Sequence, residues 1–134
     1  MPTRKAEAKW NGDLKSGNGK MKFGAFEGDF TFASRFENGT GTNPEELIGA
    51  ALSGCFSMSL SNELIKAGYE PKSTKTNADV HFEGGIKEIA LSTQVEVSGI
   101  ADDEFQKIAE GARANCHVSK ALAGTTISLQ AQLV

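Results

Sequence analysis

The sequence has few of the features that are typical of secreted, membrane or metal-stabilised proteins. Its 134 residues include only two cysteines, three prolines and one tryptophan, and no long apolar run follows the basic pair near Met1. So few cysteines argue against a disulfide-dense scaffold, and the missing apolar run argues against a signal peptide or a transmembrane start. We therefore expect a cytoplasmic protein that does not engage membranes.

An excess of charge of one sign is also missing. Lys and Arg number 14 and Asp and Glu 17, which gives a net charge of −3 without blocks of like charge. Because nucleic-acid binding needs a basic patch or stripe, we expect no nucleic-acid partner. The length and the 39% hydrophobic content are typical of one globular domain, which we place at residues 1–134.

The two cysteines, Cys55 and Cys116, lie far apart, with no CxxC motif and no neighbouring cluster of His or Asp. This spacing argues against a zinc site. Taken singly, both fit buried small hydrophobic residues as well as a redox pair, which needs a cation or helix N-terminus beside one thiol. Arg35 is a candidate cation, although alone it also fits a solvated charge whose stem covers Phe36.

Hydrophobic periodicity indicates short strands and helices in an uneven order. Alternation predicts strands at 5–10, 20–23, 29–33, 73–83, 89–97 and 127–133, with a loop at 34–42 and a hairpin turn at Gly84-Gly85. Helices are expected at 44–67, from 103 to about 115, and at 118–122. This order predicts an α+β fold with mainly antiparallel sheets.

The long helix has a clear start and an unusual composition. Asn43 as N-cap, Pro44 at the first position and Glu46 as the capping-box partner begin it, and Gly68 ends it. Small and apolar residues surround most of its circumference, more than one small sheet covers. We therefore expect a homodimer that buries it: Leu47, Ile48, Leu52, Phe56, Met58, Leu60, Leu64 and Ile65.

Several of these segments together resemble one known family. The runs 31–37, 41–51, 55–58 and 116–119 are similar to the osmotically inducible protein C (OsmC) family, relatives of the organic hydroperoxide resistance proteins. The most specific feature is the Asn-Pro-Glu-Glu-Leu helix start, with Cys55 ten residues after Glu45. The Arg-Phe pair at Arg35 shortly before it favours the OsmC branch, whereas His117 stands where the family commonly has proline.

The resemblance implies an intertwined homodimer, OsmC-like in fold, whose sites lie at the subunit interface. It also implies a thiol peroxidase without haem, metal or other resident cofactor, which reduces organic hydroperoxides in oxidative and osmotic stress defence. In these terms Cys55 is the peroxidatic nucleophile, Cys116 the resolving thiol, Arg35 the cation beside the thiolate, and Glu45 the carboxylate that holds Arg35. A lipoyl-type or other small thiol reductant would restore the pair.

Helix geometry limits how these residues meet. Ten residues of unbroken helix rise about 15 Å, too far for one Arg35 to touch both Glu45 and Cys55. We therefore expect a break at Gly49 or Gly54, with Ser53 capping a new helix, unless the partner subunit supplies the arginine.

Two further points stay open from the sequence. The aromatic and apolar residues near the motif fit a substrate pocket as well as core packing: Phe30, Phe32, Phe36, Phe56 and Met58. The alternative function is an OsmC-fold binding protein for a small hydrophobic molecule without peroxidase turnover. The presence of Cys55, Cys116, Arg35 and Glu45 together favours the enzyme.

Overall fold

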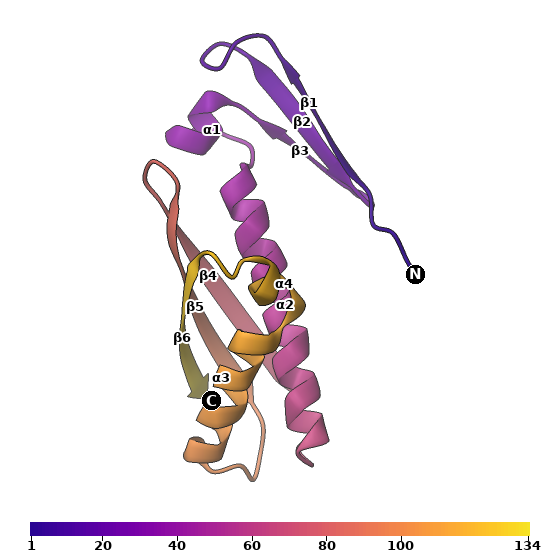
Figure 1. Ribbon diagram of the computed structural model, residues 1–134, viewed down its shortest axis with the longest axis vertical. Helices are drawn as coiled ribbons and strands as arrows, with labels where there is room; N and C mark the ends of the chain where they lie inside the picture. The colour runs from indigo at the N-terminus through magenta and orange to yellow at the C-terminus, as the bar shows by residue number, and fades with distance from the viewer. The chain divides into compact units, whose positions relative to one another are not determined.

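The computed structural model describes residues 1–134, which form two compact units, Met1–Leu47 and Ile48–Val134. Figure 1 shows the path of the chain through both units. None of its helices combines the length and the apolar character that crossing a membrane requires.

The first unit is an antiparallel sheet in the order β1 (Ala6–Asn11), β2 (Asn18–Phe23) and β3 (Phe26–Phe30). The sequence prediction placed the third strand at 29–33, which is wrong, because β3 begins and ends earlier. Gly24 has a φ of +57° and the following alanine does not have a positive φ. The pair therefore makes a two-residue turn of the II′ kind, which pairs Phe23 with Phe26 directly.

The segment expected to be a loop at 34–42 begins inside a short helix, α1 (Phe32–Phe36). Thr31 is its N-cap: the Ser34 N–H donates to Thr31 Oγ1 at 3.1 Å, and the Thr31 N–H donates to Ser34 Oγ at 2.9 Å. This reciprocal capping box explains why the strand ends at Phe30 although the alternation continues, and its Thr-x-x-Ser spacing was visible in the sequence.

The long helix α2 (Pro44–Lys66) starts and ends as predicted. The Glu46 N–H donates to Asn43 Oδ1 at 2.8 Å, which confirms the N-cap. At the other end Gly68 has a φ of +97°, and its N–H and that of Tyr69 donate to the carbonyls of Ile65 and Leu64. These two bonds form a Schellman cap.

The break expected within α2 is wrong, because the helix is continuous from Pro44 to Lys66. Gly49 is buried against β4 (Ser73–Phe82), where a Cβ would lie 3.1 Å from Val80 Cγ2. Gly54 has open space around it within the chain. Gly49 therefore permits close helix–sheet packing and does not interrupt the helix.

The second unit has a sheet in the order β4, β5 (Ile86–Glu96) and β6 (Thr126–Leu133). β4 and β5 form the predicted hairpin, whereas β6 pairs with β5 in parallel. The parallel return needs a crossover connection, which α3 (Asp102–Asn115) and α4 (His117–Ala121) supply. The predicted α+β class with mainly antiparallel sheets is confirmed.

The core of the second unit lies between α2, α3 and the sheet. Every fourth residue of α2 is fully buried, and these residues pack with β5 and α3: Leu52, Phe56, Leu60, Leu64, Ile89, Leu91, Val95, Phe105, Ala109 and Ala112. Other apolar residues of the helix remain uncovered, since Met58 is 78% exposed and Ile65 57% exposed. One copy of the chain thus leaves part of the apolar surface of α2 open.

Candidate thiol and ion-pair sites

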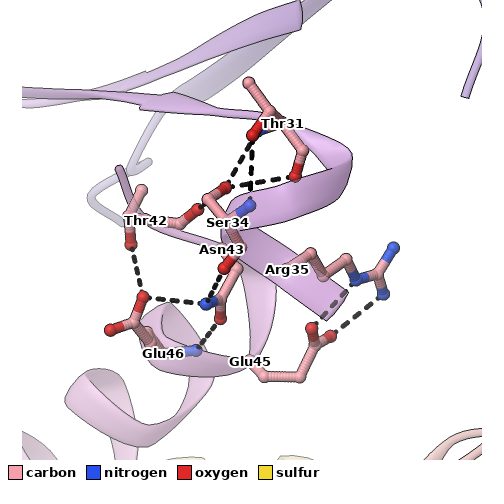
Figure 2. Close-up of polar contacts among 7 residues, drawn as sticks. All are labelled: Thr31, Ser34, Arg35, Thr42, Asn43, Glu45 and Glu46. Atoms are coloured by element: carbon pink, nitrogen blue, oxygen red, sulfur yellow. Dashed lines mark hydrogen bonds and ion pairs between the residues drawn. The ribbon is translucent and has the colours of Figure 1, made fainter. Parts of the chain in front are cut away.

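An ion pair joins α1 to the first turn of α2, which belongs to the first unit. Arg35, at the end of α1, donates from Nε to Glu45 Oε1 at 2.9 Å and from Nη2 to Glu45 Oε2 at 3.0 Å (Figure 2). The Glu45 side chain is 11% exposed and that of Arg35 is 35% exposed. This two-pronged geometry fixes the plane of the guanidinium.

A network of polar side chains holds the two helix ends together (Figure 2). Ser34 Oγ donates to the carbonyl of Thr42 at 2.7 Å, and Asn43 Nδ2 donates to the carbonyl of Ser34 at 3.0 Å and to Glu46 Oε1 at 2.8 Å. Ser34 is buried and links α1 to the residues that begin α2, although the sequence reasoning did not single it out. Its place three residues after Thr31 was the available signal.

The guanidinium of Arg35 keeps its charge in this setting. The hydrogen bonds to Glu45, and then the Coulombic attraction of that carboxylate, raise the pKa of Arg35 above its usual value. Its Cζ also lies 5.2 Å from the centroid of the Phe36 ring. Arg35 is therefore a cation paired with Glu45 on a short helix and not on a loop, but it remains exposed and lies over Phe36, as the alternative interpretation expected.

A small cavity of about 210 Å³ lies beside this cation, lined by Trp10, Leu14, Phe30, Thr31, Phe32, Arg35 and Phe36. Three of the five residues considered for a substrate pocket line it. Phe56 does not, because it is fully buried in the core of the second unit, and Met58 lines a different groove. The aromatic pocket is thus formed by the first unit alone.

The two thiols of the second unit share one groove. Cys55 on α2 is partly buried and Cys116, between α3 and α4, is 2% exposed; both are free thiols. The groove measures about 780 Å³ and runs between α2 and α3, with lining residues Cys55, Met58, Ser59, Asn62, Glu63, Lys66, Lys107, Ile108, Gly111, Ala112, Asn115, Cys116 and His117. His117 is exposed there, and His81 is exposed on β4.

Cys116 is held at the start of α4. Its Sγ lies 2.9 Å from Ser119 Oγ and accepts from the Ser119 N–H at 3.4 Å. Ser119 is 6% exposed. The sequence reasoning did not single out Ser119, although a polar residue three positions after a helix cap is a readable signal.

The structure therefore forms two pairs from the four predicted site residues. Arg35 meets Glu45 in the first unit, and Cys55 and Cys116 line one groove in the second. Along the unbroken α2, Glu45 and Cys55 are separated by a rise of about 15 Å. No group of three or more His, Cys, Asp or Glu side chains is arranged to hold a metal ion.

Comparison with known proteins identifies the family. Residues 37–130 match the model of the OsmC family, described as OsmC-like protein. The chain is 43% identical over 127 residues to Peroxiredoxin OsmC of Escherichia coli, with 89% of each chain covered. This protein therefore belongs to the OsmC family, and the predicted likeness to its OsmC branch is confirmed.

Solved structures show the same fold at low sequence identity. An OsmC-like protein from Mycoplasma pneumoniae is 14% identical with a TM-score of 0.79, covering 99% of this chain and 98% of that one. The organic hydroperoxide resistance protein of Bacillus subtilis is 23% identical with a TM-score of 0.64, covering 97% of this chain and 98% of that one. The predicted OsmC-like fold is confirmed.

Proposed function

We propose that this protein is a thiol peroxidase that reduces organic hydroperoxides to alcohols, with Cys55 as the peroxidatic thiol and Cys116 as the resolving thiol. The observation that carries this proposal is the shared groove, in which Cys55 is the more accessible thiol and Cys116 is buried. An attacking thiol must meet an external peroxide, whereas a resolving thiol needs only to reach the first sulfur. The identity to a protein named Peroxiredoxin OsmC supports the same chemistry.

The reaction proceeds in two steps. The Cys55 thiolate attacks the terminal peroxide oxygen, the O–O bond breaks, and the alkoxide takes a proton to leave as alcohol, which makes Cys55 a sulfenic acid. The Cys116 thiolate then attacks the Cys55 sulfur, the S–S bond forms, and the hydroxyl group departs as water after gaining a proton. The two thiols thereby supply both electrons that the peroxide receives.

An external thiol completes the cycle without a resident cofactor. A lipoyl-type or other small dithiol would attack the disulfide, form a mixed disulfide and leave Cys55 and Cys116 reduced. Turnover with dithiothreitol or dihydrolipoate in the presence of a metal chelator tests this requirement. Loss of activity on chelation would contradict it.

The cation that assists Cys55 comes, in this proposal, from a second copy of the chain. Arg35 forms an ion pair with Glu45 of its own chain in the first turn of α2, whereas Cys55 lies ten residues further along this unbroken helix. The exposed apolar residues Met58 and Ile65 leave α2 a surface on which a second chain can pack. In a homodimer the partner's Arg35 would stabilise the thiolate and the leaving alkoxide, with Glu45 fixing its orientation.

A mixed-chain experiment tests this arrangement. Arg35→Ala and Cys55→Ser chains, each inactive alone, are unfolded together, refolded and assayed with tert-butyl hydroperoxide. Random pairing restores one complete site in half of the dimers, so we expect about one quarter of the wild-type rate if the arginine acts across chains. No recovery, with sedimentation showing mixed dimers, would contradict it, and a monomer near the 14.2 kDa chain mass would contradict the dimer itself.

The aromatic cavity beside Arg35 supports a preference for alkyl or aryl hydroperoxides over hydrogen peroxide. We expect kcat/KM for cumene hydroperoxide to exceed that for hydrogen peroxide, and Phe32→Ala to reduce this ratio. Phe26→Ala is the matched control, because Phe26 is 70% exposed in the same unit and does not line the cavity. Equal rates for both peroxides would remove the argument for the pocket.

Thiol titration and intact mass before and after one equivalent of tert-butyl hydroperoxide test the central proposal. The wild type should lose two thiols and the mass of two hydrogen atoms, whereas Cys116→Ser should gain one or more oxygen atoms on Cys55. If both thiols stay unmodified, the peroxidase proposal is wrong, and the groove would instead favour a small-molecule binding protein.

A further inference from the structure

One buried serine makes two contacts with the sulfur of Cys116. The Ser119 hydroxyl oxygen lies 2.9 Å from Sγ, and the Ser119 N–H donates to the same sulfur at 3.4 Å. Cys116 is 2% exposed and Ser119 is 6% exposed, so water has little access to either group. The contact at α4 therefore determines where the sulfur points in the reduced protein.

We propose that Ser119 is a positioning residue for the resolving step: it holds the Cys116 sulfur in the orientation from which it attacks Cys55. This inference rests on the proposed peroxidase function. Ser119 itself touches neither the peroxide nor Cys55 in this role, and acts through Cys116.

The chemistry of the step explains why two donors help. Cys116 attacks as a thiolate, which only accepts hydrogen bonds, so the Ser119 hydroxyl and N–H both donate to it. As the S–S bond forms and the Cys55 S–O bond breaks, the negative charge passes from the Cys116 sulfur to the departing hydroxide. The sulfur then becomes a weak acceptor, and Ser119 is left chemically unchanged.

Ser119→Ala should separate the two steps of the reaction. We expect disulfide formation to slow about tenfold, the effect of losing one hydrogen bond to a charged group, while oxidation of Cys55 keeps its rate. The Cys55 sulfenic acid would then live longer and take up a second oxygen more often at high peroxide concentration.

Quenched single-turnover reactions followed by intact mass measure both steps. Oxidation of Cys55 depends on peroxide concentration, whereas disulfide formation within the protein does not, so the two rates are read from one titration. Ser119→Thr, which keeps the hydroxyl, should restore the fast disulfide step. Ala121→Gly, at an exposed position of α4, weakens the same helix without touching the sulfur and should leave both rates near those of the wild type.

The outcomes distinguish this proposal from the function on which it rests. Equal slowing of disulfide formation by Ser119→Ala and Ala121→Gly would overturn it, because Ser119 would then act only by stabilising α4. An unchanged disulfide rate in Ser119→Ala, with normal oxidation of Cys55, would overturn it as well. If the wild type loses no thiols at all, the peroxidase proposal fails instead. If the added methyl group of Ser119→Thr does not fit, the comparison between Ser119→Ala and Ala121→Gly still tests whether Ser119 positions the sulfur.

Discussion

Replacing Glu45 by glutamine tests how strongly the ion pair stabilises the junction between α1 and α2. Glutamine keeps the shape of the side chain but removes its charge, and it turns one acceptor that faces Arg35 into a donor. Hydrogen bonds to charged groups contribute about 1.5–3 kcal/mol, whereas solvent-exposed ion pairs contribute about 0.2–1 kcal/mol. Because Glu45 is buried and the Arg35 side chain is 35% exposed, we expect the stabilising free energy of this pair to lie between these two ranges.

We expect Glu45→Gln to lower the free energy of unfolding by about 2 kcal/mol, of which about 0.5 kcal/mol reflects the lost interaction of the carboxylate with the helix dipole. Urea unfolding at one fixed protein concentration measures this change. Glu46→Gln is the matched control: it removes an exposed carboxylate from the same helix turn, where the partners are Asn43 and Thr42 and not Arg35.

Glu46→Gln should therefore lower the stability by about 0.5 kcal/mol. The variant at Glu45 should also reduce kcat/KM for tert-butyl hydroperoxide more than the variant at Glu46, because a released guanidinium no longer keeps its donors in one orientation. Equal losses of stability in the two variants would refute this reasoning, since only the dipole and cap contributions are common to both.

Two further predictions concern the second unit. Gly54→Ala should raise the free energy of unfolding of the monomeric fold by about 0.5–1 kcal/mol. Gly49→Ala should raise it less or lower it, because the added Cβ would lie 3.1 Å from Val80 Cγ2. Urea unfolding midpoints of the two variants measure this difference, and equal gains would contradict the packing argument. The hydrogen bond from Arg113 lowers the pKa of Glu110 below the usual value for a glutamate side chain. The stability that this pair contributes is therefore fully present above the usual carboxyl pKa and is lost as the pH falls through the lowered pKa. The small difference in stability between wild type and Glu110→Gln should be present at neutral pH and shrink steadily in acid, which urea unfolding across pH measures.

The sequence predicted the elements whose signals lie within a few residues of each other. The N-cap at Asn43, the end of α2 at Gly68 and the β4–β5 hairpin at Gly84-Gly85 depend on such neighbours, and the structure confirms them. The same kind of local signal was present but not used at Thr31, where the capping box begins α1.

The four candidate site residues were chosen because the sequence resembles a known family, and the sequence left open how they are arranged. In the sequence, Gly49 fitted a helix break as well as a site of close helix packing, and only its position against β4 in the structure favours packing. The structure joins Arg35 to Glu45 and gives Cys55 and Cys116 a common groove. Such distances depend on side chains that meet only after the chain has folded.

The sequence by itself determined the α+β class, most element boundaries and the family. Only the tertiary structure decided that α2 is continuous, that β6 runs parallel to β5, and that one row of α2 is buried while Met58 is exposed. The periodicity of a sequence shows which residues are apolar, but it does not show which other part of the chain packs against them. That choice is made by packing between residues far apart in the chain, where burial of the largest apolar area without voids determines the arrangement.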